Sequence, residues 1–277
     1  MSTRLIINAD DYGFSSGVTD GILRSHRRGI LTSATLITTM PDAARAVEIA
    51  RATPALGVGV HLCLTQGLPR CPGQRRLLSG DGLFPDKVWK LIARISRGGV
   101  RMLHEVHREW SAQIDYALKS GLQPTHLDSH KHVHHWPPLA DVAIALAREH
   151  GIEFIRCASE AAIPGCPPPG MEYRLLLRFA RVLRRKIAAA DLRTSDWFFG
   201  LAATGRMATD IWLKLLAAPP AGTGEIMVHP GDPRGLRKTD SRLLSERRIE
   251  MDALCDLSVR EALEKSGAKL AYYGQGK

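Results

Sequence analysis

The chain has 277 residues, of which 44% are hydrophobic and 24% are charged. These values are typical of a globular domain with a sizeable core, and no apolar run approaches the roughly 20 residues of a transmembrane helix. The net charge of +10 occurs without a recognisable nucleic-acid-binding motif, so we expect no nucleic acid partner.

The chain begins without the basic start, long apolar core and cleavage site of a signal peptide. Its five cysteines are scattered and never form a CxxC pair, which argues against a disulfide framework and against a cysteine zinc site. We therefore expect a cytoplasmic location.

The first part of the chain alternates short apolar runs with helical patterns. Strands are expected over residues 5–8, 33–40 and 57–64, and helices over 17–28 and 41–52. Gly29 is suited to end the first helix and Pro41 to begin the second. The stretch 65–86 is rich in turn residues and predicts a long excursion from the domain.

The second part continues the alternation. Helices are expected over 87–120, with an interruption at Gly98-Gly99, and over 137–150, 171–189, 207–217 and 241–266; strands are expected over 153–157, 224–228 and 269–272. A proline-rich loop at 164–170 precedes the helix at 171–189. Because no linker divides the chain, we predict one α/β domain over residues 1–277, with a parallel sheet in a barrel or a doubly wound fold.

Carboxylates and histidines follow several of the predicted strands. Asp10 and Asp11 end the first strand, His61 lies in the third, and His229 follows the strand at 224–228. Each has a structural interpretation: an acidic pair at a helix N-terminus, a core histidine, and a residue that ends a strand. Active sites of α/β barrels, however, are built from the carboxyl ends of several strands. The joint pattern therefore favours a metal-dependent hydrolase.

The densest cluster of such residues lies between Thr125 and His135. It holds five histidines and Asp128 within eleven residues, and the histidines at 126, 130, 132 and 134 have even spacings. On an extended strand, even spacings place side chains on one face. Imidazole and carboxylate are common ligands of divalent metals, so the cluster predicts a metal site; a solvated polar loop is the alternative.

The helix at 171–189 has a cationic amphipathic pattern. Its regularly spaced arginines are Arg174, Arg178, Arg181 and Arg185. A solvated basic face is the favoured interpretation, and contact with an anionic membrane surface, to reach a lipid-linked sugar, is the alternative. The aromatic run 197–199 is suited equally to a sugar or lipid pocket and to the core.

Five motifs together resemble those of the YdjC-like carbohydrate deacetylases, which include chitooligosaccharide deacetylases and a branch linked to hopanoid biosynthesis. The motifs are Ile7-Asn8-Ala9-Asp10-Asp11-Tyr12-Gly13, Leu31-Thr32-Ser33-Ala34-Thr35, Gly57-Val58-Gly59-Val60-His61-Leu62, Pro124-Thr125-His126-Leu127-Asp128-Ser129-His130-Lys131-His132-Val133-His134 and Val228-His229-Pro230. The resemblance runs from Leu5 to about Pro233.

The resemblance implies a distorted (β/α) TIM-like barrel and the metal-dependent removal of an acetyl group from an N-acetylated amino sugar. Asp11, His61 and His130 would hold one divalent ion, either Mg²⁺ or Zn²⁺. Asp10 would be the general base, and His229 would protonate the leaving amine. The substrate would be an oligosaccharide containing N-acetylglucosamine, or a glycolipid.

The remaining polar residues are expected to support this site. Asp128, His132 and His134 would orient the metal ligands through hydrogen bonds or bind sugar hydroxyls, and Arg156 would hold a carboxylate in place. We also expect a homodimer. Two other functions stay open: a metal-dependent esterase or phosphoester hydrolase on the same barrel, and a carbohydrate-binding protein without catalytic activity.

Overall fold

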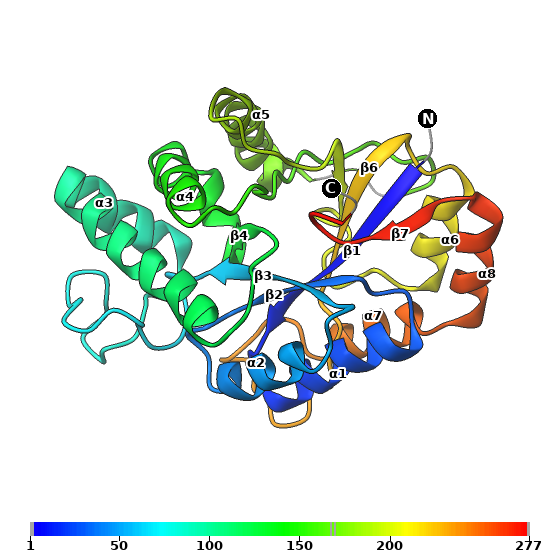
Figure 1. Ribbon diagram of the computed structural model, residues 1–277, viewed down its shortest axis with the longest axis horizontal. Coiled ribbons are helices and arrows are strands. Elements are labelled where there is room, and N and C mark those ends of the chain that lie inside the picture. Colours follow the sequence, from blue (N-terminus) through cyan, green and yellow to red (C-terminus); the bar gives the residue numbers. More distant parts are fainter. Residues whose placement is uncertain (1–2, 167, 169, 276–277) are drawn as a thin grey trace.

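The computed structural model describes residues 3–275 except 167 and 169. Its strands form one parallel sheet in the order β4-β3-β2-β1-β6-β5, and β7 pairs with β1 (Figure 1). The strands are β1 (Thr3–Tyr12), β2 (Ser33–Leu36), β3 (Gly57–Leu62), β4 (Leu127–Ser129), β5 (Trp197–Phe199), β6 (Gly222–Val228) and β7 (Lys269–Ala271).

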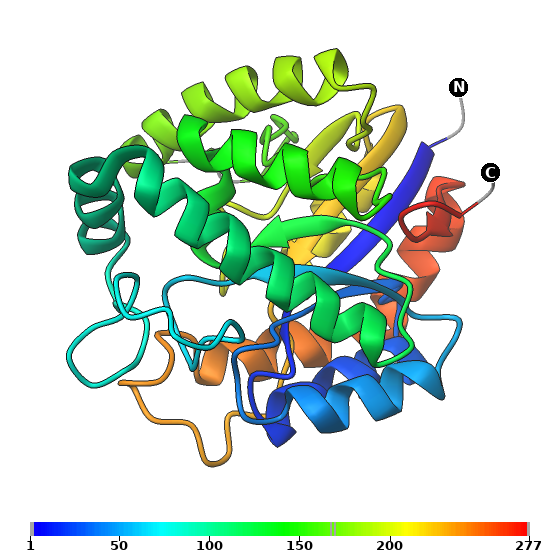
Figure 2. The ribbon, with the colours of Figure 1, turned by 60° about the vertical axis from the view of Figure 1, so that its left-hand side comes forward.

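Helices surround the curved sheet on its outer side (Figures 1 and 2). The α-helices are α1 (Ser16–Arg28), α2 (Ala43–Arg51), α3 (Val88–Lys119), α4 (Pro137–Glu149), α5 (Arg174–Ala189), α6 (Thr209–Ala217), α7 (Ser245–Leu254) and α8 (Leu257–Ser266). Two 3₁₀ helices, η1 (His130–His135) and η2 (Met171–Tyr173), complete the regular elements of the described chain.

The ring of strands is completed by single bridges in place of full ladders. Leu127 of β4 pairs with Ile155, Phe154 pairs with Arg193, and Glu160 pairs with Phe198 of β5. The strand expected at 153–157 is therefore present only as isolated bridges. The architecture is a distorted (β/α) barrel in a single domain, as predicted, and not a doubly wound sheet.

The central strand β1 fixes the position of the paired carboxylates. It is buried from Leu5 to Tyr12, because neighbouring strands and helices cover both faces. Its first part pairs with β6 and β7, and Asn8 and Ala9 also pair with β2. This pairing holds Asp10 and Asp11 at the carboxyl end of the sheet.

Two helical predictions had different outcomes. The interruption of α3 is confirmed, since Gly99 has φ 56° and ψ −142° inside the helix. The single helix expected at 241–266 is wrong, because the segment forms α7 and α8. Asp256 separates them: its Oδ1 accepts a hydrogen bond of 2.9 Å from the Ser258 backbone N–H and caps the start of α8.

Two long loops lie beyond the carboxyl ends of the strands. The excursion at 65–86 follows β3, and a second loop links β6 to α7 (Figure 2). The side-chain amide of Gln66 donates a hydrogen bond of 2.5 Å to the Asp240 carbonyl and joins them. Glu109 of α3 anchors the excursion by accepting from the backbone N–H groups of Arg70 and Cys71, at 2.9 and 2.8 Å.

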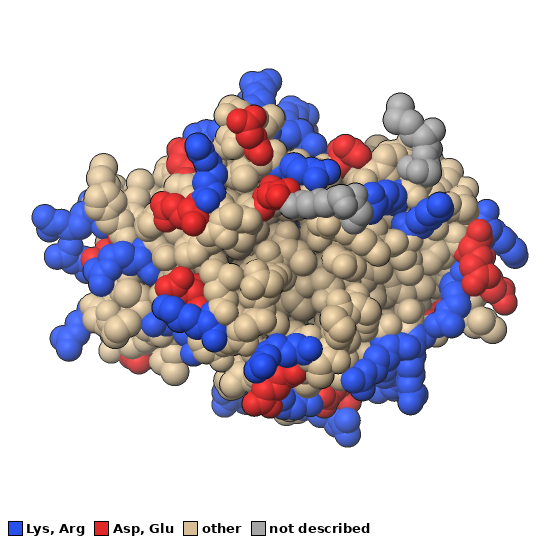
Figure 3. All heavy atoms as spheres, viewed as in Figure 1, with Lys and Arg blue, Asp and Glu red and all other residues tan. Residues whose placement is uncertain are grey.

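The basic face of α5 is solvated. Ala180, Leu183 and Ile187 pack into the core, and basic side chains surround the helix at the surface (Figure 3). The four arginines of the predicted pattern, Arg174, Arg178, Arg181 and Arg185, are all exposed. Within the described residues, no helix has both the length and the apolar character needed to cross a membrane.

The aromatic run 197–199 belongs to the core. It forms β5, a strand that the sequence did not predict, and its three side chains are at most 7% exposed. The five cysteines are all free, which agrees with their scattered positions.

Candidate active site

The two carboxylates at the end of β1 point to different partners. Asp11 has a φ of 68°, which lies in the left-handed region and turns the chain at this residue. Asp10 consequently contacts Arg156, whereas Asp11 contacts Arg247 and His130. Both aspartates are 3% exposed, so each carboxylate is almost fully withdrawn from solvent.

The three residues predicted as metal ligands converge. Asp11 Oδ1 lies 3.1 Å from His130 Nδ1 and 3.7 Å from His61 Nε2. One potential ligand atom from each residue lies within 4.8 Å of the others. Two imidazoles and one carboxylate form a donor set suited to a divalent transition metal such as Zn²⁺.

Hydrogen bonds fix His61 in this group. Its Nδ1 lies 2.7 Å from Asp128 Oδ1 and 3.3 Å from the Thr35 hydroxyl, so its Nε2 faces the aspartates of β1. Burial tends to lower the pKa of His61, but Asp128, Asp10 and Asp11 outweigh it and raise the pKa to about 9. A carboxylate behind a ligating imidazole is a common arrangement at metal sites.

His130 forms the more accessible side of the group. Its side chain is 14% exposed, compared with 1% for His61. Burial lowers the pKa of His130, although Asp11 opposes this effect. Among the described residues, its Nε2 is buried without a hydrogen-bond partner. The nitrogen that faces Asp11 is Nδ1, and in a neutral imidazole this atom can bind a metal.

Arg156 clamps Asp10. The two terminal guanidinium nitrogens lie 2.8 and 2.7 Å from the two oxygens of Asp10. One of them also lies 2.7 Å from Asp128 Oδ2, and Nε donates to Glu225 Oε1 at 2.7 Å. Burial tends to raise the pKa of Asp10, but Arg156 and His61 hold it below its ordinary value. Asp10 is therefore ionised at neutral pH.

A second group of acceptor atoms near the site is less suited to a cation. Asp10, His61 and Asp128 also bring ligand atoms within 4.8 Å of one another. The carboxylates of this group, however, are already paired with Arg156 and His61. The better candidate for a cation site is therefore the group formed by Asp11, His61 and His130.

His229 lies beside Asp10. Its Nε2 is 3.9 Å from Asp10 Oδ2, and its side chain is 13% exposed. Its backbone N–H donates to Glu250 at 2.5 Å, which fixes the end of β6. Burial lowers the pKa of His229 to about 4, against the opposing effect of Asp10 and Asp11, so the imidazole is neutral at pH 7.

The histidine-rich stretch does not present one row of side chains. The strand ends at Ser129, and η1 follows, in which Lys131 and His132 have φ values of 57° and 53°. The prediction from even spacing on an extended strand is therefore wrong beyond Ser129. Only His130 of the η1 histidines contacts Asp11.

The other histidines of η1 face elsewhere. His134 Nδ1 lies 2.6 Å from the Ser129 hydroxyl, and its Nε2 lies 3.0 Å from the Arg156 carbonyl. These contacts brace the turn. The His132 ring lies edge-on to Phe198 at 6.3 Å between centroids, and it is only partly buried.

Several residues that shape the site were not predicted from the sequence. Arg247 of α7 donates to Asp11 Oδ2 at 2.6 Å and, with His130, holds the pKa of Asp11 well below its ordinary range despite burial. Glu225 binds Arg156 and accepts a hydrogen bond from Tyr273. A lone charge in the apolar strand at 224–228 was a usable signal for Glu225. Nothing local distinguishes Arg247 from the exposed Arg248 beside it.

Fold and site together define a (β/α) barrel with a candidate centre for a divalent cation at the carboxyl ends of its strands. A family profile described as YdjC-like protein matches residues 4–265. The chain belongs to the YdjC-like family.

Named relatives and a solved structure agree with this assignment. The chain is 34% identical to a carbohydrate deacetylase of Oceanobacillus iheyensis, over 94% of this chain and all of the relative. It is 29% identical to a chitooligosaccharide deacetylase of Salmonella paratyphi B, over 96% of each chain. It also resembles the crystal structure of a putative cellobiose-phosphate cleavage protein from Enterococcus faecalis, with a TM-score of 0.80 and 32% identity over 99% of this chain and 98% of that one.

Proposed function

We propose that the protein is a metal-dependent hydrolase that removes the acetyl group from an N-acetylated amino sugar. The observation that carries the proposal is the convergence of Asp11, His61 and His130 beside a separate, arginine-held carboxylate, Asp10. The names of the relatives, carbohydrate deacetylase and chitooligosaccharide deacetylase, support this choice of substrate class.

Asp11, His61 and His130 would hold the cation. The mixed nitrogen and oxygen donors, with potential ligand atoms that lie within 4.8 Å of one another, fit such an ion. The chemistry that a divalent ion supplies when bound is polarisation of the acetyl carbonyl and a lower pKa for water.

Asp10 would act as the general base. It is ionised, and it lies next to the proposed ligands while its own oxygens are held by Arg156. A fixed carboxylate in this position can take the proton of the attacking water. Arg156 is then a positioning residue, because it orients Asp10 and Asp128 from behind.

His229 would return a proton to the leaving amine. It is neutral at pH 7, so it must first gain the proton that it donates. Asp10 is the natural source after it has accepted a proton from water, because its Oδ2 lies 3.9 Å from His229 Nε2. A short movement of either side chain would bring the two atoms within hydrogen-bonding distance.

The remaining predicted residues would divide into two roles. Asp128 would orient His61, and His134 would brace η1 through Ser129 and the Arg156 carbonyl. His132 is the candidate for a sugar hydroxyl, because it is partly exposed and its Nδ1 has no partner within the described residues.

The activity is tested with a panel of substrates at matched concentrations. Zn²⁺- and Mg²⁺-loaded protein is incubated with N-acetylglucosamine oligosaccharides, an N-acetylglucosamine glycolipid, an aryl acetate and an aryl phosphate. We expect the protein to release acetate from an acetamido sugar, and we expect this release to stop when the metal is removed by a chelator. Faster turnover of the acetate ester or the phosphate would indicate another hydrolase, and no turnover of any compound would contradict a catalytic role.

A further inference from the structure

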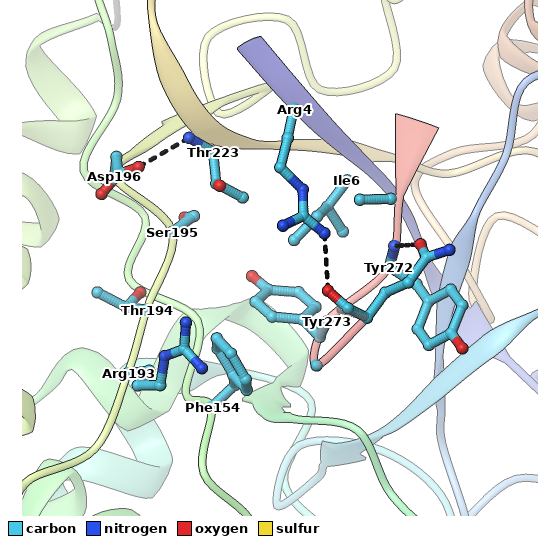
Figure 4. A pocket seen from close by; sticks show the side chains of 13 residues that line it. Arg4, Ile6, Phe154, Arg193, Thr194, Ser195, Asp196, Thr223, Tyr272 and Tyr273 are labelled. Carbon is cyan, nitrogen blue, oxygen red and sulfur yellow. Dashed lines mark hydrogen bonds between the residues drawn. The ribbon is translucent and has the colours of Figure 1, made fainter. Parts of the chain in front are cut away.

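A cavity lies at the opposite end of the barrel from the candidate active site. Its walls come from the first part of β1, the start of β6, the segment 193–196 before β5, and the end of β7 with the segment that follows it (Figure 4). Its volume is about 140 Å³. Arg4 in its wall precedes Asp10 by six residues of β1, which corresponds to roughly 20 Å along a strand. The cavity is therefore separate from the catalytic residues.

Two arginines give this cavity its charge. Arg4 enters from β1, and Arg193 enters from the side of Phe154 (Figure 4). Arg4 donates to the Gln275 carbonyl at 2.7 Å, and the guanidinium carbon of Arg193 lies 4.6 Å from the Phe154 ring centroid. A guanidinium has five N–H donors, and stacking on a ring leaves those on its edge available.

One carboxylate, that of Asp196, also lines the cavity. It accepts a hydrogen bond of 2.7 Å from the Thr223 backbone N–H, at the start of β6. The lining thus carries two guanidinium groups and one carboxylate. The excess of positive charge and of N–H donors favours an anion.

A buried hydroxyl in the same wall points independently to a ligand. Ser195 is 2% exposed, and its Oγ has no hydrogen-bond partner within the described parts of the chain. The neighbouring Thr194 hydroxyl is also buried without a hydrogen-bond partner in the described parts of the chain. Leaving a buried hydroxyl unsatisfied costs about 1–3 kcal/mol. Both residues line the cavity, and rotation of the Ser195 side chain would let its hydroxyl donate a hydrogen bond to a bound oxyanion.

The size and walls restrict the ligand. About 140 Å³ is well below the roughly 300–1,000 Å³ of sites for drug-sized molecules. Phe154 and Tyr273 add aromatic surface to the polar groups. A planar carboxylate would use one arginine fork, whereas a tetrahedral group can accept from Arg4, Arg193 and the hydroxyls at once.

We propose that this cavity is a binding site for a phosphate group, either as inorganic phosphate or as a small phosphomonoester. The guanidinium groups of Arg4 and Arg193 would bind the phosphate oxygens, with Ser195 as an additional donor. The proposal does not depend on the proposed deacetylase activity.

Calorimetric titration of the metal-free protein tests the site, because phosphate would otherwise bind a metal at the other end. Inorganic phosphate, phenyl phosphate and acetate are titrated in turn. We expect saturable binding of at least one phosphate compound and a preference over acetate. Tighter binding of phenyl phosphate would identify a monoester as the ligand, and tighter binding of the inorganic ion would identify free phosphate.

Arg193→Gln and Ser195→Ala locate the binding, and Arg178→Gln on the exposed face of α5 is the matched control. We expect Kd to rise at least tenfold in Arg193→Gln, to rise in Ser195→Ala, and to stay unchanged in Arg178→Gln. Far-ultraviolet circular dichroism confirms that each variant is folded. The proposal would be overturned if no phosphate compound saturated the protein at concentrations up to about 20 mM. An equal rise in Kd in Arg178→Gln would overturn it as well.

Discussion

Two arginines from distant parts of the chain hold the paired carboxylates at the end of β1. Arg156 binds both oxygens of Asp10, and Arg247 binds one oxygen of Asp11. The second contact leaves Asp11 Oδ1 directed at His130 and His61. Arg247 therefore acts as a positioning residue for the candidate metal centre.

Arg247→Gln is expected to destabilise the metal-free protein by about 3–5 kcal/mol at pH 7, because it leaves a buried carboxylate without its partner. Asp11 has a lowered pKa, so this contribution is present above the unfolded value of about 3.9 and is lost as pH falls below it. The penalty should therefore persist down to about pH 4 and shrink only below it, for example at pH 3. Urea unfolding at pH 7 and at pH 3 measures it.

Arg248→Gln is the matched control for this variant. Arg248 is on the same helix and pairs with Asp252, but both side chains are 50% exposed. The expected loss is below about 1 kcal/mol. If the two variants lost similar amounts of unfolding free energy at pH 7, the buried Arg247 contact would stabilise the protein no more than an exposed ion pair.

The raised pKa of His61 predicts that metal binding depends on pH. With a pKa of about 9, its Nε2 carries a proton at neutral pH that a metal must displace. Affinity for Zn²⁺ should rise about tenfold per pH unit between pH 6 and 8. Calorimetry in buffers of different ionisation enthalpy should count one released proton per ion at pH 7. An affinity that does not change with pH would contradict ligation by a His61 with a raised pKa.

Individual site residues were predictable where a strand end marked them. Asp10, Asp11 and His61 follow apolar runs, and parallel strands bring their carboxyl ends together. Glu225 and Arg247 were not predictable, because the contacts with Arg156 and Asp11 join residues 69 and 236 positions apart.

At the scale of elements, Gly29 ends α1 as predicted, but the reason that a glycine is needed there differs from the predicted one. Its φ of −123° requires no left-handed conformation. A Cβ at this position would lie 2.3 Å from the Leu254 carbonyl oxygen at the end of α7. The glycine is needed because two chain segments approach closely.

Gly29→Ala should therefore destabilise the protein by about 1–3 kcal/mol or more, since backbone atoms must move apart. Gly80→Ala is the control, because a Cβ there has no atom within 4 Å. We expect that change to stay within about 0.5 kcal/mol. Thermal unfolding of both variants compares them, and equal midpoints would contradict the packing argument.

The turn after β4 explains why the histidine pattern misled the prediction. Two consecutive left-handed residues, Lys131 and His132, break the period of two that an extended strand would give. Neither is glycine or asparagine, so the sequence holds no local signal for this conformation. Its consequence is that His130 faces Asp11 and His134 braces the turn from behind.

At the scale of the whole molecule, the alternation of strands and helices was sufficient to predict a single α/β domain. The irregular closure through Ile155, Phe154 and Arg193 was not, because isolated bridges leave no periodic pattern. Tyr273 joins the two ends of the barrel: it lines the cavity at the amino end and donates to Glu225, which holds Arg156.

The central claim is that Asp10 performs proton transfer beside a cation held by Asp11, His61 and His130. Acetate release from an N-acetylglucosamine oligosaccharide, measured together with bound metal, tests it in Asp10→Asn and Asp11→Asn. We expect Asp10→Asn to keep its metal and to lose about 10²–10⁴-fold in kcat, and Asp11→Asn to lose metal. Full activity in Asp10→Asn, or unchanged metal affinity in Asp11→Asn, would contradict the account.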